Sequence, residues 1–442
     1  RSMISVKTEY ALLSLLAVAT SIIVFPFLGV MPMRPDESIL LDLARQFSES
    51  GITSVFDENG TDFPKNFYAY LVSIVLNNTT LHEAFAVRLP SALTMQLLAI
   101  GMFLFRGSDE KMSKAFLASL LFLSSYSISS LTFHGNVTSI MALALICSLS
   151  AIYHWIKIPT KTKAYIAITA TACTSIFMGL IAPVATIAIA FLFLLIQGKK
   201  GFGTYFMIAT MIATSVALAY VSIIFITNDS LSAQNVLGIR QITETAGNIG
   251  LFSSFIGHLF FSIFPWSIPI FVAIFWIALH PKWIKDKFND LTLLKQFGVI
   301  IFVMAIPTFI VLNRLSIVML IAVIYFNMPV ISSFLLSQLH YHSITWKITG
   351  MIFASIIGMI TLLLAGIMFG IIPTPLKQTP DWSLANIAII LAIITCLYHQ
   401  WRNRRTIAYS NIYLYNIVVI YILGQMLFKG YINPYIYNFL IV

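Results

Sequence analysis

Asp36 and Glu37 are adjacent carboxylates at the start of a segment whose apolar spacing predicts an amphipathic helix. Pro35, which the first turn of a helix accepts, marks where this helix begins. Both carboxylates therefore lie in the first turn, where the helix dipole favours their ionised form. The pair either only caps the helix, which is the simpler interpretation, or supplies ionised carboxylates for chemistry.

The predicted helix has an apolar face and a polar face, so it could lie along a membrane surface. At about 100° per residue, the apolar face holds Ile39, Leu40, Leu43 and Phe47, and the polar face holds Ser38, Asp42, Arg45 and Glu49. Eight of the 16 acidic residues fall within residues 31–87. A connection this long is usually functional or disordered, and its composition does not indicate disorder.

A second stretch, residues 63–71, is aromatic and apolar and includes Tyr68, with Lys65 as its one cation. One interpretation is an aromatic belt at the membrane interface. A functional interpretation needs an anionic partner for Lys65, and a lipid phosphate at the membrane surface would be one.

Several polar residues stand at the predicted outer ends of apolar segments, where they are costly to keep near lipid. They are Arg88, His134, Asn136, Arg240, Glu244 and Arg314. Such groups usually face a cavity or a partner. For His134, a histidine satisfied by packing is the stronger interpretation.

The composition predicts that lipid surrounds most of the chain. Of 442 residues, 59% are apolar and 10% are charged, and the mean hydropathy is +0.91. Soluble domains carry about 25% charged residues, so the composition excludes a soluble or a disordered protein. The three cysteines, Cys147, Cys173 and Cys396, lie in apolar runs and indicate small buried hydrophobes. No nucleotide-loop, zinc-protease or serine-hydrolase motif is present, and we expect no metal cofactor and no nucleic-acid partner.

Thirteen segments are apolar and long enough to be membrane-crossing helices, which need about 20 residues. They lie near residues 11–30, 88–105, 115–133, 137–156, 164–181, 183–197, 204–226, 253–279, 296–312, 315–336, 348–371, 384–400 and 409–428. The division within 164–197 is the weakest. We therefore expect an all-α polytopic protein of about 13 helices, a single membrane domain over residues 1–442 without a C-terminal soluble domain, and an outer loop at 31–87.

The distribution of charge predicts the orientation of these helices. With a cytoplasmic N-terminus, 18 of the 26 lysines and arginines fall in cytoplasmic segments. Cytoplasmic loops are enriched in basic residues, so residues 31–87 and Val442 are expected on the outer side. This rule also accounts for the net charge of +10.

Several stretches match motifs of one known family. They are Met33-Arg34-Pro35-Asp36-Glu37, residues 42–47 with Gly51, residues 63–71, residues 85–93 and Phe264-Pro265-Trp266. Together with the span layout, they resemble the aminoarabinose transferase and protein mannosyltransferase group of the glycosyltransferase C superfamily. In the 63–71 stretch, the order Pro64-Lys65 is inverted relative to this family.

The resemblance implies an enzyme of a bacterial inner membrane. Such enzymes move a sugar from a polyprenyl-phosphate donor, such as undecaprenyl phosphate, to a lipid, glycan or protein acceptor on the periplasmic side. Asp36 would be the base, and Glu37 would orient it or bind sugar hydroxyls. The donor phosphate would be held by Lys65, Arg88 and Arg314, and substrate would be contacted by Tyr68, His134, Asn136 and Arg240. Arg88 has a second interpretation, in which it pins the outer loop to the second span.

Two departures from the family leave other functions open. Members often carry an aspartate where this chain has His134-Gly135-Asn136, and a lysine that usually follows the fifth span is missing from residues 179–183. A non-catalytic member of the same fold, serving as a scaffold for another membrane protein, is therefore one alternative. A transporter or flippase of a lipid-linked molecule is the other, although it predicts internal repeats that the sequence does not show.

Overall fold

The computed structural model describes residues 3–25, 28–29, 33–50, 63–105, 112–178, 181–196, 293–311 and 313–339, with short pieces between residues 210 and 267. All regular structure within these residues is helical, as predicted. The spans at 348–371, 384–400 and 409–428, most of those at 204–226 and 253–279, and Arg240 lie outside the described residues.

The described part of the chain contains the following helices, given in chain order. They are α1 (Met3–Val24), α2 (Pro35–Ser50), α3 (Phe63–Asn78), α4 (Glu83–Leu104), α5 (Met112–Ser124), α6 (Tyr126–Thr132), α7 (Thr138–Lys157), α8 (Lys161–Met178), α9 (Ile181–Ile196), α16 (Leu293–Val311) and α17 (Asn313–Leu339).

The predicted spans in this part coincide with helices. By length and composition α4 and α7 can cross a membrane, and α5 with α6 is a third candidate if that bent pair forms one span. Shorter apolar helical stretches occupy α1, α9, α16 and α17. The weakest division, within 164–197, falls between two helices, because α8 ends at Met178 and α9 begins at Ile181. These apolar helices are those of an integral membrane protein.

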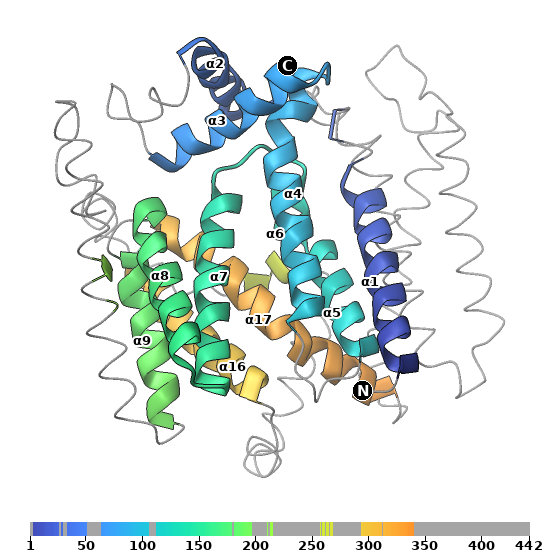
Figure 1. Cartoon of the computed structure of the whole chain (residues 1–442), viewed down its shortest axis with the longest axis vertical. Coiled ribbons are helices and arrows are strands. Elements are labelled where there is room, and N and C mark those ends of the chain that lie inside the picture. Colours follow the sequence, from blue (N-terminus) through green and yellow to red (C-terminus); the bar gives the residue numbers. More distant parts are fainter. Residues whose placement is uncertain are drawn as a thin grey trace.

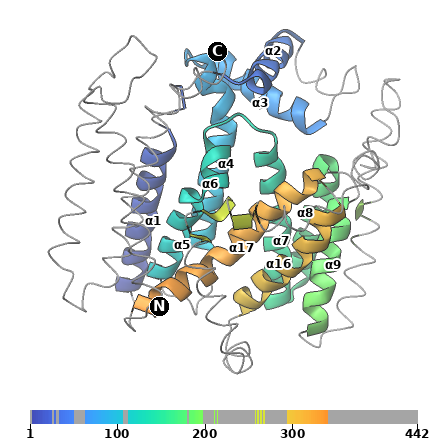
Figure 2. The same ribbon diagram turned by 180° about the vertical axis from the view of Figure 1, so that it is seen from behind.

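The arrangement separates a helical bundle from two helices that lie across one end of it (Figure 1). The helices α1, α4, α7, α8 and α9 run along the bundle, and α17 crosses it obliquely against α5 and α7 (Figure 2). The pair α2 and α3 covers the end at which α4 and α7 begin. The turn between α7 and α8, with Lys157 and Lys161, lies at the opposite end.

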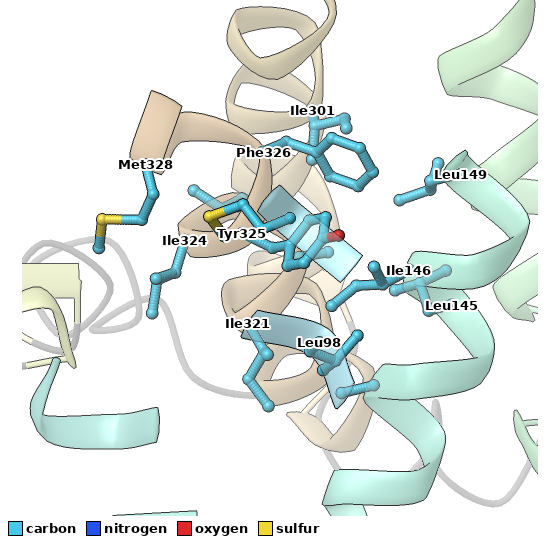
Figure 3. Close-up of a cluster of buried hydrophobic side chains, with 14 of the residues drawn as sticks. Leu98, Leu145, Ile146, Leu149, Ile301, Ile321, Ile324, Tyr325, Phe326 and Met328 are labelled. Carbon is cyan, nitrogen blue, oxygen red and sulfur yellow. The ribbon is translucent and has the colours of Figure 1, made fainter. Parts of the chain in front are cut away.

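The main cluster of buried apolar side chains joins α4, α5, α7, α16 and α17, and Figure 3 shows part of it around Tyr325 and Phe326. Helices surrounded by lipid associate mainly through close packing and hydrogen bonds. The contact between α16 and α17 uses both. A Cβ on Gly298 would lie 2.7 Å from the carbonyl oxygen of Phe326, and Asn327 Nδ2 donates to the Gly298 carbonyl at 3.0 Å.

Polar side chains join other neighbouring helices of the bundle. Gln96 on α4 donates from Nε2 to Ser21 Oγ at 2.8 Å and to Thr20 Oγ1 at 3.1 Å, both on α1. The hydroxyls of Ser148 on α7 and Thr171 on α8 lie 2.8 Å apart. Each bond satisfies polar atoms that lipid could not hydrogen-bond.

The helix α2 is amphipathic, but its buried face differs from the prediction. Leu40 and Phe47 are buried as expected, whereas Ile39 is 52% exposed and Leu41 is buried instead. The buried stripe also contains Glu37 and Ala44, at helical spacing from Leu40 and Leu41. The prediction was wrong about Ile39 because it chose the buried face from the apolar residues alone, whereas the face that packs against the protein is rotated towards Glu37, Leu41 and Ala44.

An apolar cluster and an ion pair also position α2 and α3. Side chains from both helices form a second buried cluster, which includes Leu41, Phe47 and Tyr68 and which reaches Val87 on α4 and Ile140 on α7. At the surface, Arg45 of α2 forms an ion pair with Glu83 at the start of α4. The segment that contains α2 and α3 is therefore packed against the bundle at several points.

Candidate active site

Glu37 caps the start of α2. Its Oε2 accepts from the backbone N–H of Arg34 at 2.9 Å, while the Arg34 carbonyl accepts from the N–H groups of Glu37 and Ser38. A glutamate at the third helical position that reaches back in this way forms half of a capping box. The Asp36 side chain is exposed, so the two adjacent carboxylates have different surroundings.

Glu37 also forms a buried, two-point ion pair with Arg88 of α4, 51 residues further along the chain. Arg88 Nε donates to Glu37 Oε1 at 2.8 Å, and Arg88 Nη2 donates to Oε2 at 2.7 Å. The third guanidinium nitrogen, Nη1, donates to the carbonyl of Leu28 at 2.7 Å. Both side chains are almost fully buried, at 0% and 1% exposed.

The surroundings keep Glu37 ionised. Burial alone would raise the pKa of Glu37, but the hydrogen bonds and charge of Arg88, together with the amides of Arg34 and Gly135, lower it below its ordinary value. Gly135, in the loop between α6 and α7, donates its N–H to Glu37 Oε1 at 2.8 Å. A carboxylate that accepts several such bonds is stabilised in its charged form. Glu37 thus joins α2, α4 and the 133–137 loop.

Gly135 approaches α4 too closely for any larger residue. A Cβ at this position would lie 2.7 Å from Val87 Cγ1 and 2.9 Å from the Val87 carbonyl oxygen. Gly135→Ala should therefore push the loop away from α4 and weaken the bond to Glu37, at a cost of roughly 1–3 kcal/mol. The apparent Tm of the purified protein in detergent would measure this loss.

Gly257→Ala is the matched control, because among the described residues no atom from a more distant part of the chain lies within 4 Å of the Cβ that it adds. It should leave the apparent Tm close to that of the wild type. A Gly135→Ala protein as stable as the Gly257→Ala protein would contradict the close contact between Gly135 and Val87.

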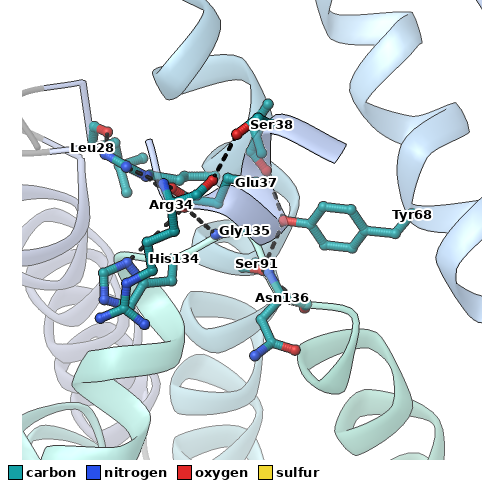
Figure 4. A network of polar contacts seen from close by, with 11 residues as sticks. Leu28, Arg34, Glu37, Ser38, Tyr68, Ser91, His134, Gly135 and Asn136 are labelled. Atoms are coloured by element: carbon teal, nitrogen blue, oxygen red, sulfur yellow. Dashed lines mark hydrogen bonds and ion pairs between the residues drawn. The ribbon is translucent and has the colours of Figure 1, made fainter. Parts of the chain in front are cut away.

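A second buried network, centred on Tyr68, ties α3 to the same loop (Figure 4). The Tyr68 hydroxyl donates to the Val87 carbonyl at 2.7 Å and lies 2.8 Å from Ser91 Oγ. Ser91 Oγ in turn accepts the N–H of Asn136 at 3.0 Å and lies 3.0 Å from Ser139 Oγ. Burial raises the pKa of the Tyr68 phenol far above its ordinary value, so Tyr68 acts as a neutral hydrogen-bonding group.

The structure brings many of the predicted site residues together, although with different exposures. Glu37, Arg88 and Tyr68 are buried and satisfied by protein groups, so none of them reaches a substrate in this arrangement. The expectation that Glu37 binds sugar hydroxyls, that Arg88 binds phosphate or that Tyr68 contacts substrate therefore has no support in this geometry. Asp36 is exposed and Lys65 is half-buried in the first turn of α3.

The other residues predicted for the site lie on the 133–137 loop, at the start of α17 or outside the described residues. His134 is 13% exposed, and its Nδ1 lies 4.0 Å from Glu37 Oε1, close enough for an ion pair when the ring is protonated. Asn136 Oδ1 accepts the N–H of Thr138 at 2.8 Å and so helps to start α7. Arg314 lies in the first turn of α17, and Arg240 lies outside the described residues.

Groups of histidine, cysteine, aspartate or glutamate that could hold a metal ion do not occur among the described residues. Of the two carboxylates at the start of α2, Asp36 is exposed and Glu37 is buried. The arrangement can therefore offer an exposed base on a helix start that a buried ion pair holds in place.

Solved structures share the fold of this chain. The crystal structure of ArnT, an aminoarabinose transferase, from Cupriavidus metallidurans bound to undecaprenyl phosphate matches with a TM-score of 0.61 and 14% identity, over 94% of this chain and 77% of that chain. Its apo state matches with a TM-score of 0.58 and 13% identity, over 96% and 78%. No protein-family model and no curated protein matches by sequence. The likeness confirms, at the level of fold, the resemblance to the aminoarabinose transferase group.

Proposed function

We propose that this membrane protein is a glycosyltransferase that takes a sugar from a polyprenyl-phosphate donor. The observation that supports this most strongly is the fold shared with ArnT over almost the whole chain, in a structure of ArnT bound to undecaprenyl phosphate. The acceptor is a lipid, a glycan or a protein. A transporter or a scaffold is not favoured, because both of these matched structures are structures of ArnT, a transferase.

The reaction proposed here is a single displacement at the anomeric carbon. The bond from this carbon to the phosphate oxygen breaks while a bond to the acceptor oxygen forms, so the configuration inverts. The acceptor proton passes to a base, and the electron pair of the broken bond leaves with the polyprenyl phosphate. Asp36 is the proposed base, because it is exposed and stands at the start of α2, which Glu37 caps.

Glu37 and Arg88 are proposed as positioning residues. Their buried ion pair connects the start of α2 to α4, and this holds Asp36 in place without contacting substrate. Charge that develops on the leaving phosphate needs cations. Lys65 is the first candidate because it is half-buried at the start of α3. Arg314 remains a second candidate, and His134, Asn136 and Arg240 remain candidates for substrate contact.

The chain would lie in a bacterial inner membrane with residues 31–87 in the periplasm, because the distribution of basic residues favours that orientation. The donor is a lipid, so its tail can stay in the bilayer while its phosphate reaches the outer surface. This displacement requires neither a metal ion nor an organic cofactor.

Lys65→Ala should weaken binding of the donor phosphate. A charged hydrogen bond to an anion in a partly dehydrated site contributes about 1.5–3 kcal/mol, which corresponds to a roughly 10- to 100-fold increase in Kd. Binding of undecaprenyl phosphate to the purified protein in nanodiscs, measured by titration, would test this. The transfer of labelled sugar from a polyprenyl-phosphate donor by the wild-type protein would test the function itself.

Lys161→Ala is the matched control, because Lys161 is an exposed lysine in the first turn of α8, at the opposite end of the bundle. It should leave the Kd unchanged. If folded Lys65→Ala protein binds undecaprenyl phosphate as tightly as the wild type, Lys65 does not belong to the donor site.

A further inference from the structure

The helices α5 and α6 meet at a sharp bend of 68°. Ser125 stands at the bend, and its N–H is shared between the carbonyls of Leu121 at 3.1 Å and Phe122 at 3.2 Å. Its hydroxyl donates to the Leu121 carbonyl at 2.8 Å. A broken helix at membrane depth is tolerated only where other protein groups satisfy its ends. Other protein groups must therefore satisfy the polar atoms that this bend leaves without helical partners.

A segment far away in the sequence holds both sides of this bend. The indole N–H of Trp266 donates to Ser124 Oγ, at the end of α5, at 2.9 Å. The Phe264 carbonyl accepts the N–H of Tyr126, the first residue of α6, at 3.0 Å. The first N–H groups of a helix have no partner within it, so the Phe264 carbonyl satisfies one of these groups in α6. Trp266 is 1% exposed and is among the largest fully buried side chains described.

The bend determines where the 133–137 loop lies. The helix α6 has only seven residues, a length of roughly 10 Å, and Gly135 follows three residues after its end. A rotation of α6 by about 5° about the bend would move its far end by about 1 Å. Gly135 has no room for such a movement, because it contacts Val87 and bonds to Glu37.

We propose that Trp266 is a positioning residue for the candidate active site. Through Ser124 and the bend it sets the direction of α6, which presses Gly135 against α4 and onto Glu37, and Glu37 in turn fixes the start of α2 with Asp36. The inference rests on the proposed function for its catalytic consequence. The mechanical link itself rests on the hydrogen bonds and the burial alone.

Two single variants and their combination test the link. Trp266→Phe keeps an aromatic ring and removes the indole N–H, and Ser124→Ala removes the acceptor. In each, we expect amide exchange in the peptide that contains residues 133–137 to accelerate roughly three- to tenfold, as the loss of one hydrogen bond predicts. The double variant should exchange no faster than Ser124→Ala alone, because both substitutions remove the Trp266–Ser124 bond, and Ser124→Ala also removes the bond from Ser124 Oγ to the Leu121 carbonyl at 3.1 Å.

Kinetics supply the second measurement. A displacement of about 1 Å near a reacting group can cost up to about a hundredfold in rate. We therefore expect kcat for sugar transfer to fall roughly tenfold in Trp266→Phe, with KM for the donor within about twofold of the wild type. A purely structural loss would lower the amount of folded enzyme and leave the kcat of the folded fraction unchanged.

Trp155→Phe is the control, since Trp155 is 3% exposed on α7 and lies outside this link. The proposal is overturned if Trp266→Phe leaves exchange at 133–137 unchanged, or if Trp155→Phe accelerates it equally. If the wild type transfers no sugar from any polyprenyl-phosphate donor, the proposed function fails, but the exchange measurement still decides whether Trp266 positions the loop.

Discussion

Asp36→Asn should fold, bind donor and transfer sugar at least about a hundredfold more slowly than the wild type, as loss of a general base predicts. Asparagine keeps the size of the side chain and removes its charge and its ability to take a proton. The structure makes this substitution a clean test, because Glu37, not Asp36, caps α2. The measurement is the initial rate of transfer from a polyprenyl-phosphate-linked sugar, alongside the apparent Tm and donor affinity.

Asp42→Asn is the matched control for this experiment. Asp42 is a second exposed carboxylate on the same helix, and its contact is an ion pair of 3.7 Å with Arg45. Its loss should leave transfer within about twofold, because exposed ion pairs contribute little. Full activity in a folded Asp36→Asn protein would overturn the assignment of the base. A wild type inactive with every lipid-linked sugar would favour the scaffold interpretation.

The sequence predicted the positions of the described membrane helices well, because a long apolar run directly indicates a helix that lipid surrounds. It did not predict the bend between α5 and α6. Residues 115–133 form one apolar run in the sequence, and no proline or glycine interrupts it. The bend depends on Ser124, Ser125 and on Trp266, which is 142 residues from Ser124. A contact at that separation leaves no local pattern.

The sequence predicted which residues belong to the candidate site better than it predicted the contacts between them. Glu37 and Arg88 were both identified, but the spacing of 51 residues hides the fact that they pair with each other. One local signal was available, since a glutamate three positions after Arg34, at the expected start of a helix, fits half of a capping box. The contact of Gly135 with Val87 could not be foreseen, because a glycine alone does not reveal which backbone it approaches.

Removing either partner of the Glu37–Arg88 pair should destabilise the protein by roughly 3–5 kcal/mol, because a buried charge is left without its partner. Glu37→Gln leaves the Arg88 guanidinium facing a neutral amide, and Arg88→Met leaves the Glu37 carboxylate buried without its counter-charge. The double variant removes both charges and should be less destabilised than the sum of the single variants. Unfolding of the four proteins in mixed detergent would give the coupling energy, expected to be at least about 2 kcal/mol.

The same pair predicts how stability depends on pH. The pKa of Glu37 is lower in the folded protein than its ordinary value of 4.5. A carboxyl group with this shift adds stability at pH values above the unfolded pKa, and the added stability is lost as the pH falls through the folded pKa. From pH 7 to about 5 we expect no change from Glu37. Below about pH 4.5 the wild type should lose apparent Tm more steeply than the double variant, which lacks the carboxyl group.

The exposed pair of Arg45 and Glu83 provides the matched control for the coupling measurement. It also joins α2 to α4, but its side chains are 55% and 47% exposed, so its coupling energy should be about 1 kcal/mol or less. A Glu37–Arg88 coupling no larger than that of Arg45–Glu83 would contradict the buried pair as the anchor of α2. If the buried pair couples strongly and Glu37→Gln also lowers transfer, a cycle with Asp36→Asn separates the two effects. A positioning role predicts that Glu37→Gln has little further effect once Asp36 can no longer act as a base.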